Sequence, residues 1–162
     1  MTEEIPRLEA LFIWFEDTAV GAAVRESVWA FAVIESVHLL GLCLLGGSIL
    51  LVDLRLLGFG LTRQPIAGVA AAARRWTVLG LSIMVATGIP LMLSEALKTY
   101  YSTAFWVKIT TLPFAIAFTF LVRERMTREP SLTVSFRTRI VAAVSVALWF
   151  TVAAGGRWIG FS

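Results

Sequence analysis

Residues 29–52 read WAFAVIESVHLLGLCLLGGSILLV, and this stretch decides what kind of protein the chain is. Its 24 residues, at about 1.5 Å each, are enough to cross a bilayer core of about 30 Å, a length that a buried helix of a soluble protein rarely needs. Two ionisable residues lie within it, Glu35 and His38, and His38 is the only histidine among the 162 residues. Because ionisable side chains are costly inside a membrane, these two are the first candidates for a functional site.

The composition of the whole chain agrees with a membrane location. Hydrophobic residues make up 58%, charged residues 15%, and the mean hydropathy is +0.82. A soluble globule of this size needs more polar surface, so we expect an integral membrane protein. The basic pI does not indicate a nucleic-acid partner, because the arginines fall between apolar runs. Cys43, the single cysteine, lies in the first run, where it packs as a small hydrophobe.

Four apolar runs predict four membrane spans, over about 28–53, 76–97, 103–123 and 139–160. Pro90 and Pro113 fall inside spans and predict kinks rather than helix ends, because neighbouring helices can satisfy the freed carbonyls. Residues 5–24 have apolar side chains at helical spacing and predict an amphipathic helix in the outer interface. The acidic N-terminal residues do not have the features of a removable signal peptide. We therefore expect an all-α fold in which residues 1–162 form one transmembrane four-helix bundle.

The distribution of basic residues predicts the orientation. The first and third predicted loops carry nine lysines and arginines, whereas the second carries only Lys98. Since basic loops are retained in the cytoplasm, the first and third loops should face it. Both termini then lie on the outer, periplasmic side of a bacterial inner membrane, to which we assign this multi-pass protein.

Counting from the outer ends of the spans brings several ionisable groups to one level. Glu35 lies roughly 9 Å deep, His38 roughly 14 Å deep and Lys108 about 8 Å deep at 1.5 Å per residue. Glu95 and Arg157 also lie in the outer halves of their spans. Such groups can be merely structural, with Glu35 and Lys108 as an ion pair that fixes helix register and His38 donating to a carbonyl. They can also form a site.

The single histidine limits the chemistry of such a site. Glu35 and His38 have the i, i+3 spacing of carboxylate-bridged di-iron helices, but the second such motif is absent. A four-histidine di-haem cytochrome is excluded, and zinc or copper would need further ligands. One porphyrin remains, with His38 as axial metal ligand, and it is either five-coordinate or completed by Met92, which lies at similar depth. Gly46, on the same face as His38, would admit a flat ligand, while Lys108 and Arg157 would meet its propionates.

Three segments carry a resemblance to known families: RESVWAFAVIESVHLLGLCLLGGSILLVDLRLLG, RRWTVLGLSIMVATGIPLM and FWVKITTL. Together they resemble an uncharacterised family of small four-span bacterial inner-membrane proteins. That family is similar, more distantly, to HemJ-type protoporphyrinogen oxidases and CopD-like membrane domains, which share a histidine on the first core span and a lysine at the head of a later one. His38 and Lys108 are the matching residues, and the resemblance implies haem b as cofactor.

These observations predict a membrane haem- or porphyrin-binding protein with a redox or electron-transfer role. His38, Gly46, Met92 and Arg157 are the candidate cofactor-binding residues, and Lys108 and Glu35 the candidate catalytic residues of a haem-dependent oxidoreductase. Its partners would be the lipid bilayer and a quinone, a tetrapyrrole or a redox protein, in a homo-oligomer or a larger complex. The alternative is a non-enzymatic membrane subunit or a copper-handling membrane protein in which the polar cluster is structural.

Overall fold

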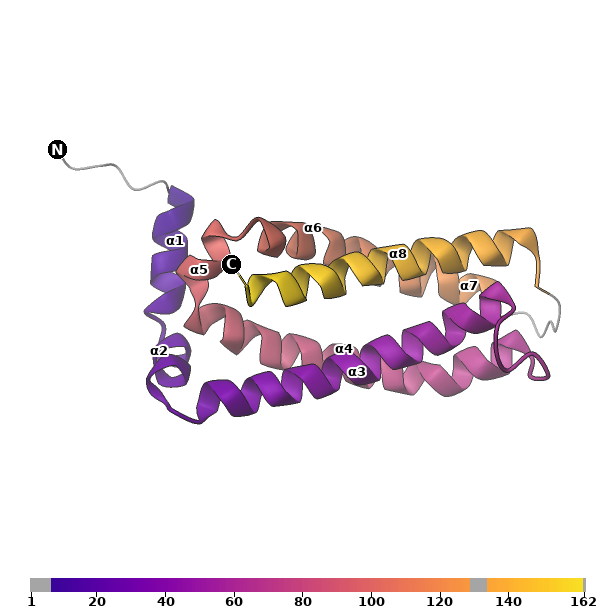
Figure 1. Ribbon diagram of the computed structural model, residues 1–162, viewed down its shortest axis with the longest axis horizontal. Coiled ribbons are helices and arrows are strands. Elements are labelled where there is room, and N and C mark those ends of the chain that lie inside the picture. The colour runs from indigo at the N-terminus through magenta and orange to yellow at the C-terminus, as the bar shows by residue number, and fades with distance from the viewer. Residues whose placement is uncertain (1–6, 129–133, 162) are drawn as a thin grey trace.

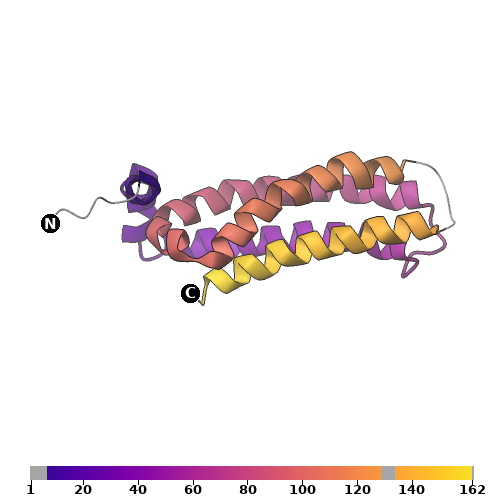
Figure 2. The ribbon, with the colours of Figure 1, turned by 90° about the horizontal axis from the view of Figure 1, so that it is seen from above.

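Four long helical rods run side by side and form an elongated bundle (Figures 1 and 2). The computed structural model describes residues 7–128 and 134–161, and these ranges contain helices and their connections only. The first, second and fourth rods are single helices: α3 (Ala30–Leu57), α4 (Ile66–Ser94) and α8 (Phe136–Ile159). The third rod is continuous through three elements: α6 (Thr103–Ala117), the π-helix η1 (Phe118–Arg123) and α7 (Glu124–Met126).

All four rods are long and apolar enough to cross a membrane. Their outward faces carry large apolar side chains that the bundle does not cover, among them Leu40, Phe114 and Phe150, each about 70% exposed. Such contiguous apolar surface is costly in water and is accommodated by lipid. The all-α fold with four helices long and apolar enough to span a membrane is therefore confirmed, while the direction in which they cross stays a prediction.

Two helix boundaries differ clearly from those predicted. α3 continues to Leu57, four residues past the predicted end, and α4 begins at Ile66 rather than at residue 76. The added segment of α4 is rich in alanine, the strongest helix former, but too polar at Arg74 and Arg75 to resemble a membrane span. As predicted, Pro90 and Pro113 lie inside α4 and α6 and do not end these helices.

Close helix packing depends on small residues. A Cβ on Gly80 of α4 would lie 2.7 Å from the backbone nitrogen of Leu45 on α3, and one on Gly41 would lie 2.6 Å from the Ile83 side chain. On the other side of the bundle, a Cβ on Gly155 of α8 would lie 3.1 Å from the carbonyl oxygen of Ala104 on α6. Helices α3 and α4 thus form one tight pair, and α6 and α8 form another.

One end of the bundle, here called the capped end, is covered by short helices. α1 (Arg7–Glu16) and α2 (Ala19–Glu26) lie across it, next to α5 (Ala96–Tyr101) (Figure 1). The predicted helix over 5–24 is thus two helices, divided where the Thr18 hydroxyl accepts a hydrogen bond from the Gly21 amide and caps α2. Its placement in the outer interface stays a prediction, and residues 5 and 6 lie outside the described ranges.

The capped end has its own small core and a polar clamp. Phe12 of α1 packs against Ala96 and Phe105, with Met92 beside them. The Tyr101 hydroxyl donates a 2.5 Å hydrogen bond to Glu9. That hydrogen bond, with burial and the Glu9 charge as smaller causes, raises the pKa of the Tyr101 phenol above its ordinary value. The contacts hold α1 against α5.

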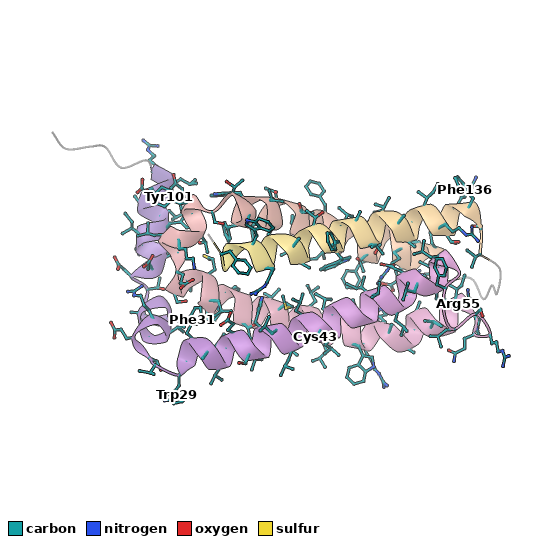
Figure 3. All side chains as sticks on the ribbon, viewed as in Figure 1. Trp29, Phe31, Cys43, Arg55, Tyr101 and Phe136 are labelled. Carbon is teal, nitrogen blue, oxygen red and sulfur yellow. The ribbon has the colours of Figure 1, made fainter. Side chains whose placement is uncertain are left out.

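The opposite end, here called the basic end, is where α3 ends, α4 begins, α7 ends and α8 begins. Figure 3 shows Arg55 and Phe136 at this end and Trp29 and Tyr101 at the other. Its apolar core joins α3, α4 and α8 through six buried residues: Val52, Leu56, Ile66, Val69, Ala73 and Ala142. The basic residues predicted to lie in loops gather here, although most of them lie within helices: Arg55, Arg63, Arg74, Arg75, Arg123, Arg125, Arg128, Arg137 and Arg139.

Candidate functional site

His38 lies in the capped half of α3 and faces α4. Its Nδ1 is 2.7 Å from the Thr87 hydroxyl oxygen, and that hydroxyl donates a 2.6 Å hydrogen bond to the carbonyl oxygen of Ile83 in its own helix. A hydroxyl has one proton, so both hydrogen bonds are made together only when Nδ1 of His38 carries the ring proton. Nε2 then keeps its lone pair and is the free coordinating atom of the ring.

The position of the ring follows from the close packing of α3 on α4. A Cβ on Gly88 would lie 3.2 Å from Cε1 of His38, so the absence of a side chain at residue 88 makes room for the imidazole. Thr87 is the preceding residue of α4, and its hydroxyl therefore reaches the same ring. The half-buried histidine is held by one helix and oriented by its neighbour.

Lys108 projects from α6 along the glycines of α8. A Cβ on Gly156 would lie 3.4 Å from Nζ of Lys108, and one on Gly155 would lie 3.2 Å from its Cβ. Within the described residues no carboxylate lies within 4.0 Å of this ammonium group. His38 and Lys108, the two residues that carry the family resemblance, therefore both lie in the capped half of the bundle.

The other predicted site residues are not gathered around His38. Glu35 is exposed and makes no ion pair with Lys108, so the register-fixing pair does not form. Glu95 pairs instead with Lys98, at 3.7 Å. The guanidinium of Arg157 is exposed and stacks over the Phe161 ring at 4.5 Å.

Met92 and Gly46 have different surroundings. Met92 packs in the aromatic core of the capped end, five residues beyond Thr87 and thus roughly 140° around the helix from the hydroxyl that faces His38. The structure therefore does not bring its thioether to His38 as a second axial ligand. Gly46 has no atom within 4 Å of the position that a Cβ would take, so its face of α3 is open.

A second polar cluster, at the basic end, was not predicted. Asp53 is completely buried in α3, and its two carboxylate oxygens have different donors. Oδ1 accepts a 3.1 Å hydrogen bond from Nη1 of Arg123, and Oδ2 accepts a 2.7 Å hydrogen bond from the hydroxyl of Ser145. Arg123 Nη1 also donates to the carbonyl oxygen of Ile49, at 3.3 Å. The cluster joins α3, η1 and α8 through an ion pair that is almost free of solvent.

Two further polar contacts lie between the two clusters. The hydroxyls of Ser48 on α3 and Thr77 on α4 are 2.9 Å apart, and the indole nitrogen of Trp149 donates to Thr119 at 2.9 Å. Trp149 lies in the middle of α8, and this hydrogen bond satisfies its indole nitrogen away from water. These contacts and the Asp53 cluster satisfy several buried polar side chains between helices.

The described ranges contain no cluster of three or more histidine, cysteine, aspartate or glutamate side chains that could hold a metal ion. Cys43 is exposed and lies outside any such cluster. A metal bound by side chains alone generally needs three or four of them. A metal at His38 would therefore need donors that the protein does not supply in these ranges.

Comparison with known families gives one match. The model of a family of unknown function (DUF6644) matches residues 11–162, and the chain therefore belongs to that family. No curated protein and no solved structure matches the chain. Membership of a family without an assigned activity agrees with the nearer resemblance drawn from the sequence, while the more distant one, to HemJ-type and CopD-like proteins, stays a prediction.

Proposed function

We propose that this member of a family of unknown function is a membrane haem-binding protein in which Nε2 of His38 is an axial ligand of haem b. The observation that carries the proposal is the hydrogen bond between His38 and Thr87. Ligating histidines usually donate their second ring nitrogen to an oxygen of the protein, which fixes the tautomer and the ring orientation. Thr87 is such a partner for Nδ1.

The scarcity of side-chain ligands also supports a porphyrin over a bare metal. A porphyrin brings four nitrogen donors of its own, so one histidine is enough to hold its iron. The described chain offers no cluster that could hold a metal ion by side chains alone, which favours the haem proposal over the copper-handling alternative. Haem b would supply one-electron redox chemistry, and the electron partner would be a quinone, a tetrapyrrole or a redox protein.

Lys108 would bind an anionic group of the ligand. Its ammonium lies among α8 glycines without a carboxylate partner in the described ranges, and a propionate would neutralise it. We assign Lys108 this binding role; a direct part in a redox reaction would require a substrate next to it. We assign Arg157 and Gly46 no direct role in haem binding, because Arg157 stacks on Phe161 and Gly46 faces open space.

A haem titration of the purified full-length chain tests this proposal. We expect a saturable Soret band for the wild type and none for His38→Ala. Thr87→Val keeps the side-chain shape but removes the hydroxyl, so the haem affinity should fall by about 10- to 100-fold. Thr110→Val is the matched control, because the Thr110 hydroxyl is exposed and bonds only to its own helix. Equal Soret bands for wild type and His38→Ala would refute the proposal.

The non-enzymatic alternative is favoured by a different observation, the Asp53 cluster. A buried ion pair that joins three helical elements is what a structural subunit would use to fix its fold. This role does not compete with haem binding, because the Asp53 cluster and His38 lie 15 residues apart on α3, roughly 22 Å along the helix. If the protein does not bind haem but unfolds when the Asp53 cluster is removed, only the non-enzymatic alternative would fit.

A further inference from the structure

A partly open cavity of about 280 Å³ lies at the basic end, between α4 on one side and η1 and α7 on the other. It is separate from the His38 site and extends from the buried Thr77 and Thr119 outward to Arg128. Its α4 wall is built from small side chains, chiefly Ala67, Ala70 and Ala71, which leave the space that larger residues would fill.

The opposite wall includes Arg123, whose side chain is only 7% exposed but does not use all its donors. Nη1 makes both of its hydrogen bonds, to Asp53 and to the carbonyl of Ile49. Nε and Nη2 have no partner in the described chain, yet no buried side-chain nitrogen there lacks one. Arg123 lines the cavity, so these two nitrogens are the donors that it can offer there.

The charges around the cavity favour an anion. Arg74 and Arg128 line it together with Arg123. Two carboxylates oppose them: Glu124 pairs with Arg74 at 3.2 Å, and Asp53 pairs with the inner edge of Arg123. Three guanidinium groups against two carboxylates leave one positive charge, and Arg128 has no ion-pair partner among the described residues.

The π-helix lies at this site. Thr119, Phe120 and Arg123 of η1 all line the cavity. Single π-helical turns inside α-helices are rare and often occur at functional sites, since the wider turn changes the direction of its side chains. Here the turn directs Arg123 both to Asp53 and to the cavity.

We propose that this cavity binds a negatively charged phosphate group, carried by an acidic lipid headgroup or by a soluble phosphate compound. Planar guanidinium groups match phosphate oxygens with paired hydrogen bonds. The volume is slightly below that of pockets for drug-sized ligands, and therefore suits a headgroup rather than a larger molecule. Basic pockets between membrane helices, at the level of the headgroups, are where acidic lipids bind.

Native mass spectrometry of the full-length protein in detergent tests the proposal with phosphatidylglycerol as probe and zwitterionic phosphatidylcholine as comparison. We expect preferential retention of phosphatidylglycerol. Arg128→Gln should weaken its binding about tenfold or more, and Ala71→Phe, which fills the cavity from an exposed position, should weaken it similarly. Arg63→Gln is the control, because it removes the same charge at the same end of the bundle but does not line the cavity.

Competition with inorganic phosphate separates the two sources. Displacement of phosphatidylglycerol by millimolar phosphate would assign the cavity to soluble phosphate compounds, and retention would assign it to lipid. Arg123→Gln is left out of the binding series because it leaves Asp53 unpaired and affects the fold. Equal retention of the two lipids, or equal losses in Arg128→Gln, Ala71→Phe and Arg63→Gln, would overturn the proposal. The result is independent of haem binding.

Discussion

The two halves of the bundle treat their buried polar groups differently. At the basic end, Asp53 has a donor on each oxygen and Arg123 pairs with it, so both charges are compensated within the protein. In the capped half, His38 is hydrogen-bonded through Nδ1 only, and Lys108 has no anionic partner in the described ranges. Since unpaired polar groups are costly in a membrane, the first arrangement is typical of structure and the second of a binding site.

The largest expected effect concerns the orientation of the two halves. If the nine basic residues of the basic end are retained in the cytoplasm, a reporter that is active only in the periplasm should be active after Ser162 and inactive near Gln64. Activity of both fusions should be read against their expression levels. The opposite pattern would place the His38 half towards the cytoplasm and the basic end towards the periplasm.

Removal of Arg123 should be the most destabilising of the single changes considered. Arg123→Met leaves the completely buried Asp53 carboxylate without its cation, and breaking such a pair costs about 3–5 kcal/mol. Unfolding in detergent, followed by circular dichroism, measures the change. Arg74→Met is the matched control, because its pair with Glu124 is largely exposed and contributes at most about 1 kcal/mol.

A double variant, Asp53→Leu with Arg123→Met, should recover much of the lost stability, since both charges are then absent. If Arg123→Met were no worse than Arg74→Met, the basic end would not be a structural cluster, and the contrast between the two halves would fail.

A smaller effect is expected where α3 and α4 cross, between the two halves. Gly80→Ala places a Cβ within 2.7–2.9 Å of Leu45, mostly its backbone, and should cost about 1–3 kcal/mol through forced separation of the helices. Gly46→Ala is the control, because a Cβ there meets nothing within 4 Å and should be neutral or slightly stabilising. Equal stabilities of the two variants in the same unfolding assay would contradict the close helix contact.

The smallest effect is expected for Glu35 and Lys108 in a double-mutant cycle. Because Glu35 is exposed and makes no ion pair, the coupling between Glu35→Ala and Lys108→Ala should be below about 0.5 kcal/mol in unfolding experiments. Lys108→Ala should instead weaken haem binding while stability stays nearly unchanged. A coupling of several kcal/mol would show that Glu35 and Lys108 form a structural ion pair, and would contradict the binding role of Lys108.

Hydropathy alone was enough to predict the four spans, because runs such as 29–52 are apolar on nearly every face. It misplaced the start of α4, since Arg74 and Arg75 resemble loop residues although the alanines before them favour a helix. His38 and Lys108 could be found because each is an ionisable residue within an apolar run. Their placement in the same half of the bundle followed from counting depth in an antiparallel bundle.

The Asp53 cluster could not be found in this way. Asp53 and Arg123 are the last residues of two predicted spans, where apolar runs give way to charged residues, so neither was expected to be buried. α3 continues to Leu57 and the third rod continues beyond Arg123 through α7, so both residues lie inside helices rather than at span ends. The hydrogen bond between Thr87 and His38 likewise could not be predicted, because it depends on the register of α3 against α4. The sequence pattern does not specify that register.

The most direct test of the central claim, that the capped half is a binding site built on His38, is the visible absorption spectrum of the full-length protein purified from membranes. We predict a Soret band that is absent from His38→Ala, while the far-UV circular dichroism of the two proteins is the same. A wild-type protein that is colourless, and stays without a Soret band after haem is supplied, would contradict the claim.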